Sequence, residues 1–327
     1  MSKTFISSFA DKQTVHTFFL AKDKNIQTGK NGRKYMSLIL SDKSGSIDAR
    51  VWDNVEELDN TFQSGDVVNV KGLVQLFQGR LQFIVHKLEK AEEGTYDVKD
   101  FVSKSDRDGE EMFQELLEIV RGLHDPNIKQ LILNTLEDPE IKPLLLISPA
   151  AKTIHHAKEG GLLEHVLSIC GVMKFMASHY PQLNEDLLVF GAIFHDIGKV
   201  WELKIDKGIH YTDVGRLVGH LVLASELVEK KASQIMGFPE NLKNVCKHII
   251  LSHHGKLEFG SPKRPKFLEA FVVAMIDDLD SKIDTISSLC EMDRGAGASW
   301  TRYAPMFDRY FYLSPHNGMD IDPEAEQ

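Results

Sequence analysis

The sequence contains little cysteine. It has three in 327 residues, and Cys170, Cys246 and Cys290 lie far apart. No two of them form a Cys-x-x-Cys pair, which argues against a structural zinc ribbon. An odd number of widely spaced cysteines also argues against a disulfide framework and favours a reducing compartment. We therefore expect a cytoplasmic protein.

Long hydrophobic runs are also absent. The longest apolar stretches, such as 187–194, stop at eight residues, whereas a membrane-spanning helix needs about 18. The first residues, MSKTFISSFADKQ, lack the apolar segment of a secretory signal, so we expect no membrane partner. Gly-x-Ser-x-Gly, Walker and dinucleotide-binding glycine motifs are missing too, which leaves those nucleophile and phosphate-binding schemes without support.

Positive charge is not in excess. The net charge is −10, of which residues 1–95 contribute +1 and the remainder −11. A nucleic-acid role would therefore depend on local basic patches rather than on the field of the whole chain. The contents of 42% hydrophobic and 26% charged residues are typical of a folded globular protein, and the length suggests two domains.

Residues 1–95 show the pattern of β-strands. Apolar and β-branched runs recur about every ten residues, separated by turn residues such as Gly65 and Gly79. In the third run Ile47, Ala49 and Val51 alternate with their neighbours, which indicates a strand with one buried face. The five runs are 15–26, 34–41, 46–53, 66–77 and 80–88.

A short helical stretch, 55–62, lies between the third and fourth runs. Five strands with a helix at that point are the content of an OB-fold barrel, and a small SH3-like barrel is the alternative. We therefore predict an N-terminal five-stranded OB-fold domain over residues 1–95, followed by a polar linker over 96–109.

From Glu110 onward the apolar period becomes helical, with an N-cap and an N1 proline at Asp125-Pro126. Apart from the short connection 201–211, no hairpin signature follows. We predict an all-α domain over 110–312 and a C-terminal tail over 313–327. Its later helices are expected at 161–179, 185–195, 215–235, 240–252 and 267–290.

Histidine and aspartate are concentrated in this second part, which holds 12 of the 14 histidines. Five motifs, each flanked by glycine or apolar residues, stand out on the predicted helices. They are His165, His195-Asp196 within HDIGK, His220, His253-His254 and Asp277.

Imidazole and carboxylate ligands suit Mn²⁺, Fe²⁺ or Zn²⁺, and an aspartate can bridge two ions. Two ions with open positions lower the pKa of a bound water, and the metal-bound hydroxide can attack a phosphate held between them. The motifs therefore predict phosphoester hydrolysis. A single histidine at a helix end is more simply explained as a cap, and a single buried aspartate as a hydrogen-bonded acid, but five coincident motifs favour the metal centre.

This series of motifs resembles that of the HD-domain metal-dependent phosphohydrolase superfamily, whose signature is HDIGK. With the barrel in front, nearly the whole chain resembles the YhaM-type 3′→5′ exoribonucleases, which join an N-terminal OB-fold to a C-terminal HD domain. The resemblance implies two divalent ions, Mn²⁺ first, with iron, cobalt or zinc as alternatives. It also implies a homo-oligomer.

By similarity, His165, His195, Asp196 and Asp277 would bind one metal ion, and Asp196 would bridge to a second ion held by His220 and His253. The family has alanine before the last aspartate, where this chain has Ile276. Asp196, Lys199 and His254 are the expected catalytic residues, with Lys199 and His254 contacting substrate phosphate.

Residues near these motifs are weaker candidates. Asp280 lies one helical turn after Asp277, so its carboxylate could approach the ions. Lys152, His155 and His156 precede the first motif, where they could line the substrate entrance or simply cap a helix.

The predicted barrel carries candidate nucleic-acid contacts, because OB-folds stack bases on aromatic side chains within a basic groove. Protein–protein contact is the competing use of such a module. The candidates lie in the first hairpin, on the third strand and at the last turn: Lys22, Lys24, Lys30, Arg33, Tyr35, Arg50, Trp52, Phe77 and Arg80.

Three hypotheses follow. The first is a 3′→5′ exoribonuclease acting on single-stranded RNA or also single-stranded DNA, with polarity and RNA preference implied by the resemblance alone. The second is an HD phosphohydrolase of a free nucleotide or cyclic dinucleotide whose OB module binds a partner. The third is a non-catalytic nucleic-acid-binding protein with a structural metal, against which the complete ligand set argues.

Overall fold

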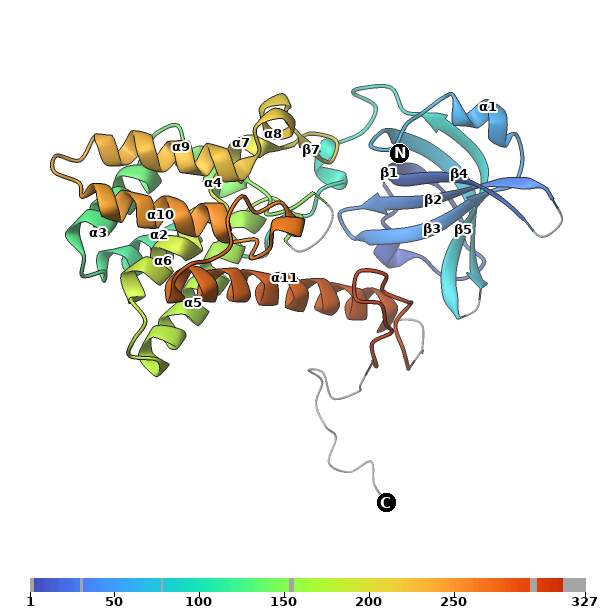
Figure 1. Cartoon of the computed structure of the whole chain (residues 1–327). Coiled ribbons are helices and arrows are strands. Elements are labelled where there is room, and N and C mark those ends of the chain that lie inside the picture. Colours follow the sequence, from blue (N-terminus) through green and yellow to red (C-terminus); the bar gives the residue numbers. More distant parts are fainter. Residues whose placement is uncertain (1–2, 30–31, 78, 153–155, 295–298, 314–327) are drawn as a thin grey trace, which may run out of the picture. The chain divides into compact units, whose positions relative to one another are not determined.

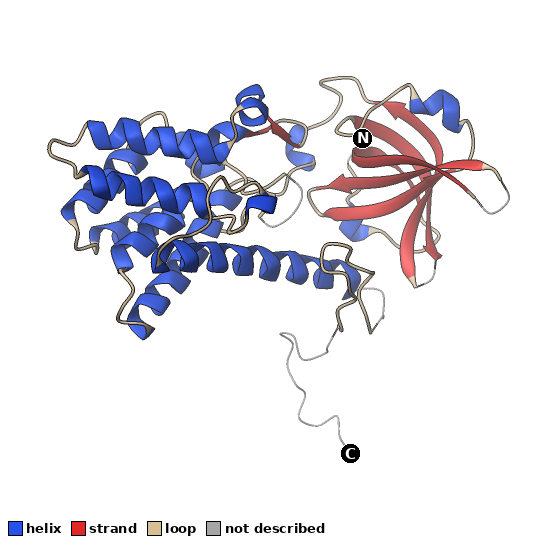
Figure 2. Ribbon diagram, in the orientation of Figure 1, coloured by secondary structure: helices blue, strands red, loops and turns tan. Residues whose placement is uncertain are grey.

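The structure is a computed structural model that describes residues 3–29, 32–77, 79–152, 156–294 and 299–313. Its contacts divide the chain into two compact units, residues 102–284 and residues 1–101 with 285–327 (Figure 1). Strands dominate the first part of the chain and helices the second, as Figure 2 shows. This confirms the predicted fold class.

The first unit contains a closed five-stranded barrel with the strand order β1-β2-β3-β5-β4. Its interior is filled by phenylalanine and branched side chains, among them Phe19 and Phe83, which are fully buried. Ile47, Ala49 and Val51 face this core, as their alternation predicts. The elements are η1 (Ile6–Ser8), β1 (Thr14–Thr28), β2 (Lys34–Asp42), β3 (Gly45–Val51), α1 (Val55–Asp59), β4 (Val67–Phe77), β5 (Arg80–Lys90) and η2 (Val98–Asp100).

The expected linker over 96–109 is not a free connection throughout. Phe101 is buried with Leu20 and Val67 beside the barrel, and Tyr96 packs on its ring. Residues up to Phe101 therefore belong to the first unit because an aromatic anchor holds them there.

The second unit consists of helices with one small hairpin. Aspartate N-caps begin two of the helices, since Asp108 and Asp125 each accept hydrogen bonds from two backbone N–H groups of the first turn. The elements are α2 (Gly109–Arg121), α3 (Pro126–Leu136), α4 (Lys142–Ile147), α5 (Gly161–His179), α6 (Glu185–Phe194), α7 (Lys199–Glu202), β6 (Leu203–Ile205), β7 (Ile209–Tyr211), α8 (Asp213–Leu217), α9 (His220–Ser233), α10 (Glu240–Ser252), η3 (Leu257–Phe259) and α11 (Leu268–Arg294).

The prediction of a single helix over 215–235 is wrong. The chain forms α8, turns at Gly219 with φ of +80°, and begins α9 at His220. Positive φ favours glycine, so Gly219 is the residue that permits the break. The break matters for the site, because it places His220 in the first turn of a new helix.

The unit boundary falls inside α11, between Asp284 and Thr285. Residues 110–312 were expected to form one domain, whereas the described residues after Asp284, 285–294 and 299–313, group with the barrel. Within that segment, isolated bridges join Trp300 to Tyr312 and Ala304 to Arg309, so this stretch folds back on itself.

Helix α5 is long and apolar enough to cross a membrane by length and composition alone. Half of its apolar window is buried inside the structure, which is the usual state of the core helix of a globular domain. Its apolar side chains belong to the main core of the second unit, beside those of α6.

A buried ion pair fastens α9 to the segment after α3. The Lys231 ammonium lies 2.5 Å from the Asp138 carboxylate and donates to the Asn134 carbonyl at 2.8 Å. The bond from Lys231 holds the pKa of Asp138 below its usual value. Removing one partner of such a pair leaves a buried charge without its counter-ion.

We expect Asp138→Asn to lower the free energy of unfolding by about 1–2 kcal/mol at pH 7, measured from urea midpoints at unchanged m value. Because the folded pKa is depressed, this stability is present above the unfolded pKa and is lost as the pH falls through the folded one. The difference between the two proteins should therefore shrink below about pH 4. Asp278→Asn, which removes an exposed pair with Lys282, is the control and should cost under about 0.5 kcal/mol. Equal losses in the two variants would contradict the account.

Candidate metal centre and nucleic-acid surface

The conspicuous histidines and aspartates lie on or next to five helices, α5, α6, α9, α10 and α11, which Figure 1 labels. His165 lies in the first turns of α5, and His220 begins α9. His253 caps the C-terminus of α10 and Asp277 lies within α11. The remaining pair, His195 and Asp196, follows α6 directly.

A first cluster is formed by His165, His195, Asp196 and Asp277. The Nε2 atoms of His165 and His195 lie 3.3 Å apart, and they lie 3.3 and 3.5 Å from Oδ1 of Asp277. The second oxygen of Asp196, Oδ2, lies 3.4 Å from Nε2 of His195. Ligand bonds of about 2.1 Å place neighbouring ligand atoms about 3.0–3.4 Å apart, so these separations suit one ion.

A second cluster adjoins the first through the other oxygen of Asp196. Its Oδ1 lies 3.5 Å from Nε2 of His220 and 3.6 Å from Nε2 of His253. His254 completes a second group of ligand atoms with these two histidines. Among the described residues, neither Oδ1 of Asp196 nor Nε2 of His220 has a hydrogen-bond partner, although both are buried.

Buried polar atoms without partners cost free energy, and a cation between them removes that cost. The donor set of imidazole nitrogens and carboxylate oxygens fits divalent Mn, Fe, Co or Zn. The residues present therefore fit two ions that share Asp196.

The other ring nitrogen of each candidate histidine ligand already has a hydrogen-bond partner. Nδ1 of His195 lies 3.0 Å from the Ala192 carbonyl, and Nδ1 of His253 lies 2.8 Å from the Ile250 carbonyl. A carbonyl accepts only from an N–H group, so in a neutral imidazole Nε2 carries the lone pair. These contacts point the metal-binding nitrogens inward.

Glu202 holds Nδ1 of His220 in the same way. The sequence analysis did not identify this residue. Its carboxylate lies 3.0 Å from Nδ1 of His220 and accepts the His220 backbone N–H at 3.0 Å. No sequence signal distinguishes Glu202 from other glutamates, because its role depends on the helix break at Gly219. For His165 the equivalent partner is Asp280, whose Oδ2 lies 2.8 Å from Nδ1.

The two buried aspartates favour positive charge at the site. Burial lowers the pKa of His195, but the carboxylates of Asp196 and Asp277 outweigh burial and raise it to about 10. Burial also works against ionisation of Asp277, yet His195 and His165 hold its pKa well below the usual range. Both carboxylates are therefore ionised at neutral pH and attract cations.

Lys199 and His254, the expected substrate contacts, both lie at this centre. The Lys199 ammonium donates to Oδ2 of Asp196 at 2.6 Å. His254 places Nδ1 3.0 Å from the Phe259 carbonyl, and burial together with the charges of His253 and His220 lowers its pKa to about 4. His254 is thus a neutral imidazole at pH 7.

Of the residues expected to line the substrate entrance, Lys152 faces solvent and His156 does not. Lys152 is exposed on the segment before α5. His156 instead turns its side chain inward to Asp280, with Nε2 3.4 Å from Oδ2. His155 lies outside the described residues.

The barrel presents part of the expected aromatic surface. Trp52 is half exposed, and its ring lies 4.9 Å from that of Tyr35 at an angle of 31°. Lys22 and Arg33 are exposed, while Arg50 donates to Ser37 and to the Ala49 carbonyl. Lys30 lies outside the described residues.

Lys24, expected to contact nucleic acid, instead makes contacts within the barrel domain. Its ammonium lies 2.9 Å from the Asp59 carboxylate and donates to the carbonyls of Asp59 and Phe62. It is nearly buried, so it holds the end of α1 on β1 rather than facing solvent.

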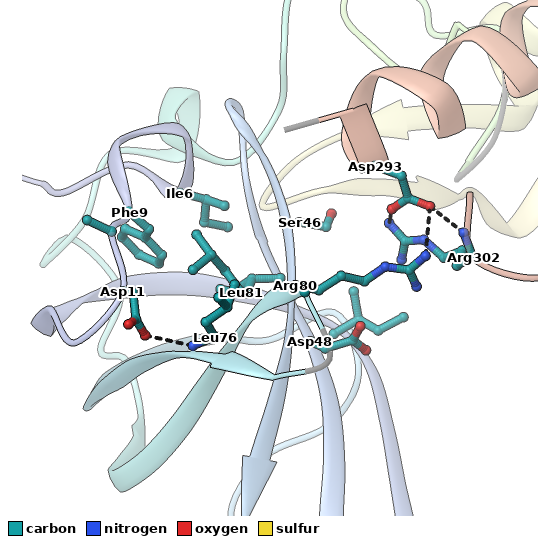
Figure 3. A pocket seen from close by; sticks show the side chains of 14 residues that line it. Ile6, Phe9, Asp11, Ser46, Asp48, Leu76, Arg80, Leu81, Asp293 and Arg302 are labelled. Carbon is teal, nitrogen blue, oxygen red and sulfur yellow. Dashed lines mark hydrogen bonds and ion pairs between the residues drawn. The ribbon is translucent and has the colours of Figure 1, made fainter. Parts of the chain in front are cut away.

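At the β4–β5 turn, Phe77 is exposed, but Arg80 is already paired. Figure 3 shows Arg80 and Arg302 converging on Asp293 at the wall of a pocket of about 390 Å³. The guanidinium nitrogens lie 3.6 and 3.3 Å from that buried carboxylate. A nucleic-acid phosphate would have to compete with Asp293 for Arg80.

Comparison with known families assigns both parts of the chain. Residues 21–91 match the family described as an OB-fold nucleic acid binding domain, and residues 162–282 match the HD domain. The prediction of an OB-fold module followed by an HD domain is confirmed. An HD domain indicates a metal-dependent phosphohydrolase.

The solved structures that the chain resembles include three of low identity. The second OB-fold domain of replication protein A from Methanococcus maripaludis is 23% identical, covers 29% of this chain and 100% of its own, and gives a TM-score of 0.24. A single-stranded DNA binding protein from Thermus aquaticus is 16% identical over 26% of this chain and 42% of its own, with a TM-score of 0.23. The mitochondrial single-stranded DNA binding protein of S. cerevisiae is 12% identical over 26% and 100%, also with a TM-score of 0.23.

The glycine of the HDIGK motif makes the second cluster possible. A Cβ atom on Gly198 would lie 2.2 Å from the carbonyl oxygen of His220 and 2.8 Å from its Cα. The backbone of His220 can therefore approach Asp196 only because position 198 has no side chain.

We expect Gly198→Ala to displace His220 and to weaken the binding of one of two Mn²⁺ ions at least about 10-fold, measured by calorimetric titration. Gly171→Ala is the matched control, because a Cβ there meets nothing within 4 Å. Unchanged affinity for both ions in Gly198→Ala would show that this close approach does not position the ligand.

Proposed function

We propose that this OB-fold and HD-domain protein is a metal-dependent 3′→5′ exoribonuclease that hydrolyses phosphodiester bonds of single-stranded RNA, and also accepts single-stranded DNA. The observation that carries the hydrolytic part is the sharing of Asp196 between two adjoining ligand clusters. Bound divalent cations would supply electrophilic activation of the phosphate and would lower the pKa of a water molecule. Mn²⁺ is the proposed ion.

The chain's own residues would orient the reacting groups. The histidine Nε2 atoms hold their ligand positions because their Nδ1 atoms are anchored elsewhere. Lys199 brings a positive charge to the same carboxylate, where it can also meet a phosphate oxygen. Because Nδ1 of the neutral His254 donates to the Phe259 carbonyl, its Nε2 can accept a hydrogen bond.

The barrel supports the choice of a single-stranded polymer as substrate. Exposed Trp52 packs on partly buried Tyr35, and Phe77 is exposed at the β4–β5 turn. Such rings stack with unpaired bases whatever their sequence. Polarity and RNA preference rest on the likeness of the motifs to the YhaM-type enzymes.

A homo-oligomer is part of the proposal, and a specific surface supports it. Helix α11 carries Phe271, Met275, Leu279 and Ile283 at intervals of four residues, and each is about half exposed. Helix α5, bonded to α11 through Ser168 and Asp280, exposes Val172 and Phe175. We name these six residues and Leu268 the α5–α11 face.

A second copy of the chain suits the α5–α11 face. Antiparallel pairing of α11 about Asp277 would set Phe271 against Ile283 and Met275 against Leu279. Seven side chains at this exposure correspond to roughly 700 Å², near the ~800 Å² that each partner buries in a standard interface.

For the activity, we expect wild-type protein with Mn²⁺ to shorten a 5′-labelled RNA oligomer stepwise from its 3′ end. Asp196→Asn should lower the rate about 10³-fold, because it removes the charge that two ions share. Asp278→Asn, an exposed acid one residue from Asp277, is the control and should retain the ladder. Gel analysis of timed samples gives both rates.

The competing hypothesis, hydrolysis of a free nucleotide or cyclic dinucleotide, gives the opposite pattern. RNA would remain intact while a small phosphoester is cleaved by wild type and not by Asp196→Asn. Trp52→Ala would then leave that cleavage unchanged, whereas in the proposed enzyme it should weaken RNA binding by about 1–3 kcal/mol.

For the oligomer, we expect Met275→Glu to lower the mass measured by light scattering after gel filtration, because a charge would enter the apolar contact. Met236→Glu is the matched control, since Met236 is fully exposed at the turn before α10. A wild-type mass of one chain, or no difference between the variants, would contradict the proposed contact.

A further inference from the structure

Asp280 joins three elements of the second unit although it is no part of the two ligand clusters. Its Oδ2 lies 2.8 Å from Nδ1 of His165, and its Oδ1 accepts from the Ser168 hydroxyl at 2.5 Å. Nε2 of His156 lies 3.4 Å from the same Oδ2. The carboxylate is thus held by α5 and by the segment before α5 while it faces His165.

His156, His165 and Asp280 also group closely enough to suggest a third ion. The 2.8 Å separation decides against it, because two ligand atoms of one ion stand about 3.0–3.4 Å apart, whereas 2.8 Å is a hydrogen-bond length. An ion on Nδ1 of His165 would also displace the proton that leaves Nε2 free for the first cluster. His156 and Asp280 therefore support His165 from behind by hydrogen bonding, and the three residues do not form a third metal site.

The segment that carries His156 is built to hold it there. His156 has a φ of +50°, which is costly for a residue with a side chain, and its backbone N–H donates to Asp284. A Cβ atom on Gly161 would lie only 2.0 Å from the His156 carbonyl oxygen, so this conformation requires glycine at position 161. The His156 side chain is nine-tenths buried. A strained, glycine-dependent conformation that buries a histidine against Asp280 points to a positioning role.

We propose that Asp280, supported by Ser168 and His156, is the positioning residue that orients His165 and so sets the affinity of the first cluster for its ion. Asp280 accepts a hydrogen bond from Nδ1–H of His165, which fixes the orientation of the ring and its tautomer. Ser168 fixes the second oxygen of the carboxylate, so the carboxylate cannot rotate away. This inference rests on the proposed metal centre.

A purely structural role is the rival, because Asp280 also ties α11 to α5. The two roles differ in what they change. A tie between helices would lower the stability of the protein without added metal, whereas a positioning residue would lower metal affinity beyond any loss of stability. Asp278 offers a control on the same helix, since its carboxylate pairs only with exposed Lys282 among its described contacts.

The experiment measures Mn²⁺ affinity by calorimetry and thermal unfolding of metal-stripped protein, for the full-length chain and its variants. Asp280→Asn should weaken the tighter binding step about 10- to 100-fold. Asp280→Glu should recover part of the affinity, and Asp278→Asn should equal wild type. Unchanged affinity in Asp280→Asn, or a loss matched by Asp278→Asn, would overturn the proposal.

A double variant separates positioning from a general effect. If Asp280 acts through His165, then Asp280→Asn should change the affinity less than about twofold in a His165→Ala background. A full additional loss there would show that Asp280 acts independently of His165. Failure of the wild-type protein to bind Mn²⁺ would contradict the metal centre itself, and is thereby distinguished from failure of this inference.

Discussion

One carboxylate, that of Asp196, governs the arrangement of the second unit. Its two oxygens face different groups of histidines, Oδ2 toward His165 and His195 and Oδ1 toward His220 and His253. Three helices, α5, α9 and α10, and the turn after α6 must therefore meet within the length of a single side chain. A buried, ionised aspartate among imidazoles is expensive unless cations or protons compensate it, so this meeting point is stable only with a positive charge at its centre.

Glycine makes the close approach possible. Gly191 lets α6 contact α11, because a Cβ there would lie 2.4 Å from a methyl group of Val273. Gly198 lets the backbone of His220 approach the HD motif, and Gly215 lets α8 approach the backbone of Glu202. The apolar sides of these helices pack together, and the absence of a side chain at each glycine allows their backbones to come close. Close backbone contacts thus help to place the clustered histidines.

Much of this could be predicted from the sequence, and the rest could not for identifiable reasons. Strand alternation and helical periodicity are local, so the barrel and the main helices were predicted close to their observed bounds. The HDIGK signature predicted that His195, Asp196 and Lys199 lie together, because all three follow the end of one helix, α6. Glu202 escaped notice since its partner, His220, is 18 residues away and reaches it only through the break at Gly219. Lys24 and Arg80 were expected to face solvent, but both are bound by carboxylates distant in sequence, which no local pattern reveals.

The most direct test of the account is the anomalous diffraction of crystals soaked in Mn²⁺. The account predicts two manganese peaks about 3.5–4 Å apart with the Asp196 carboxylate between them. His165, His195 and Asp277 should surround one peak, and His220 and His253 the other. A single peak, or peaks that leave Asp196 without a metal contact, would contradict the central claim that this carboxylate is shared by two ions.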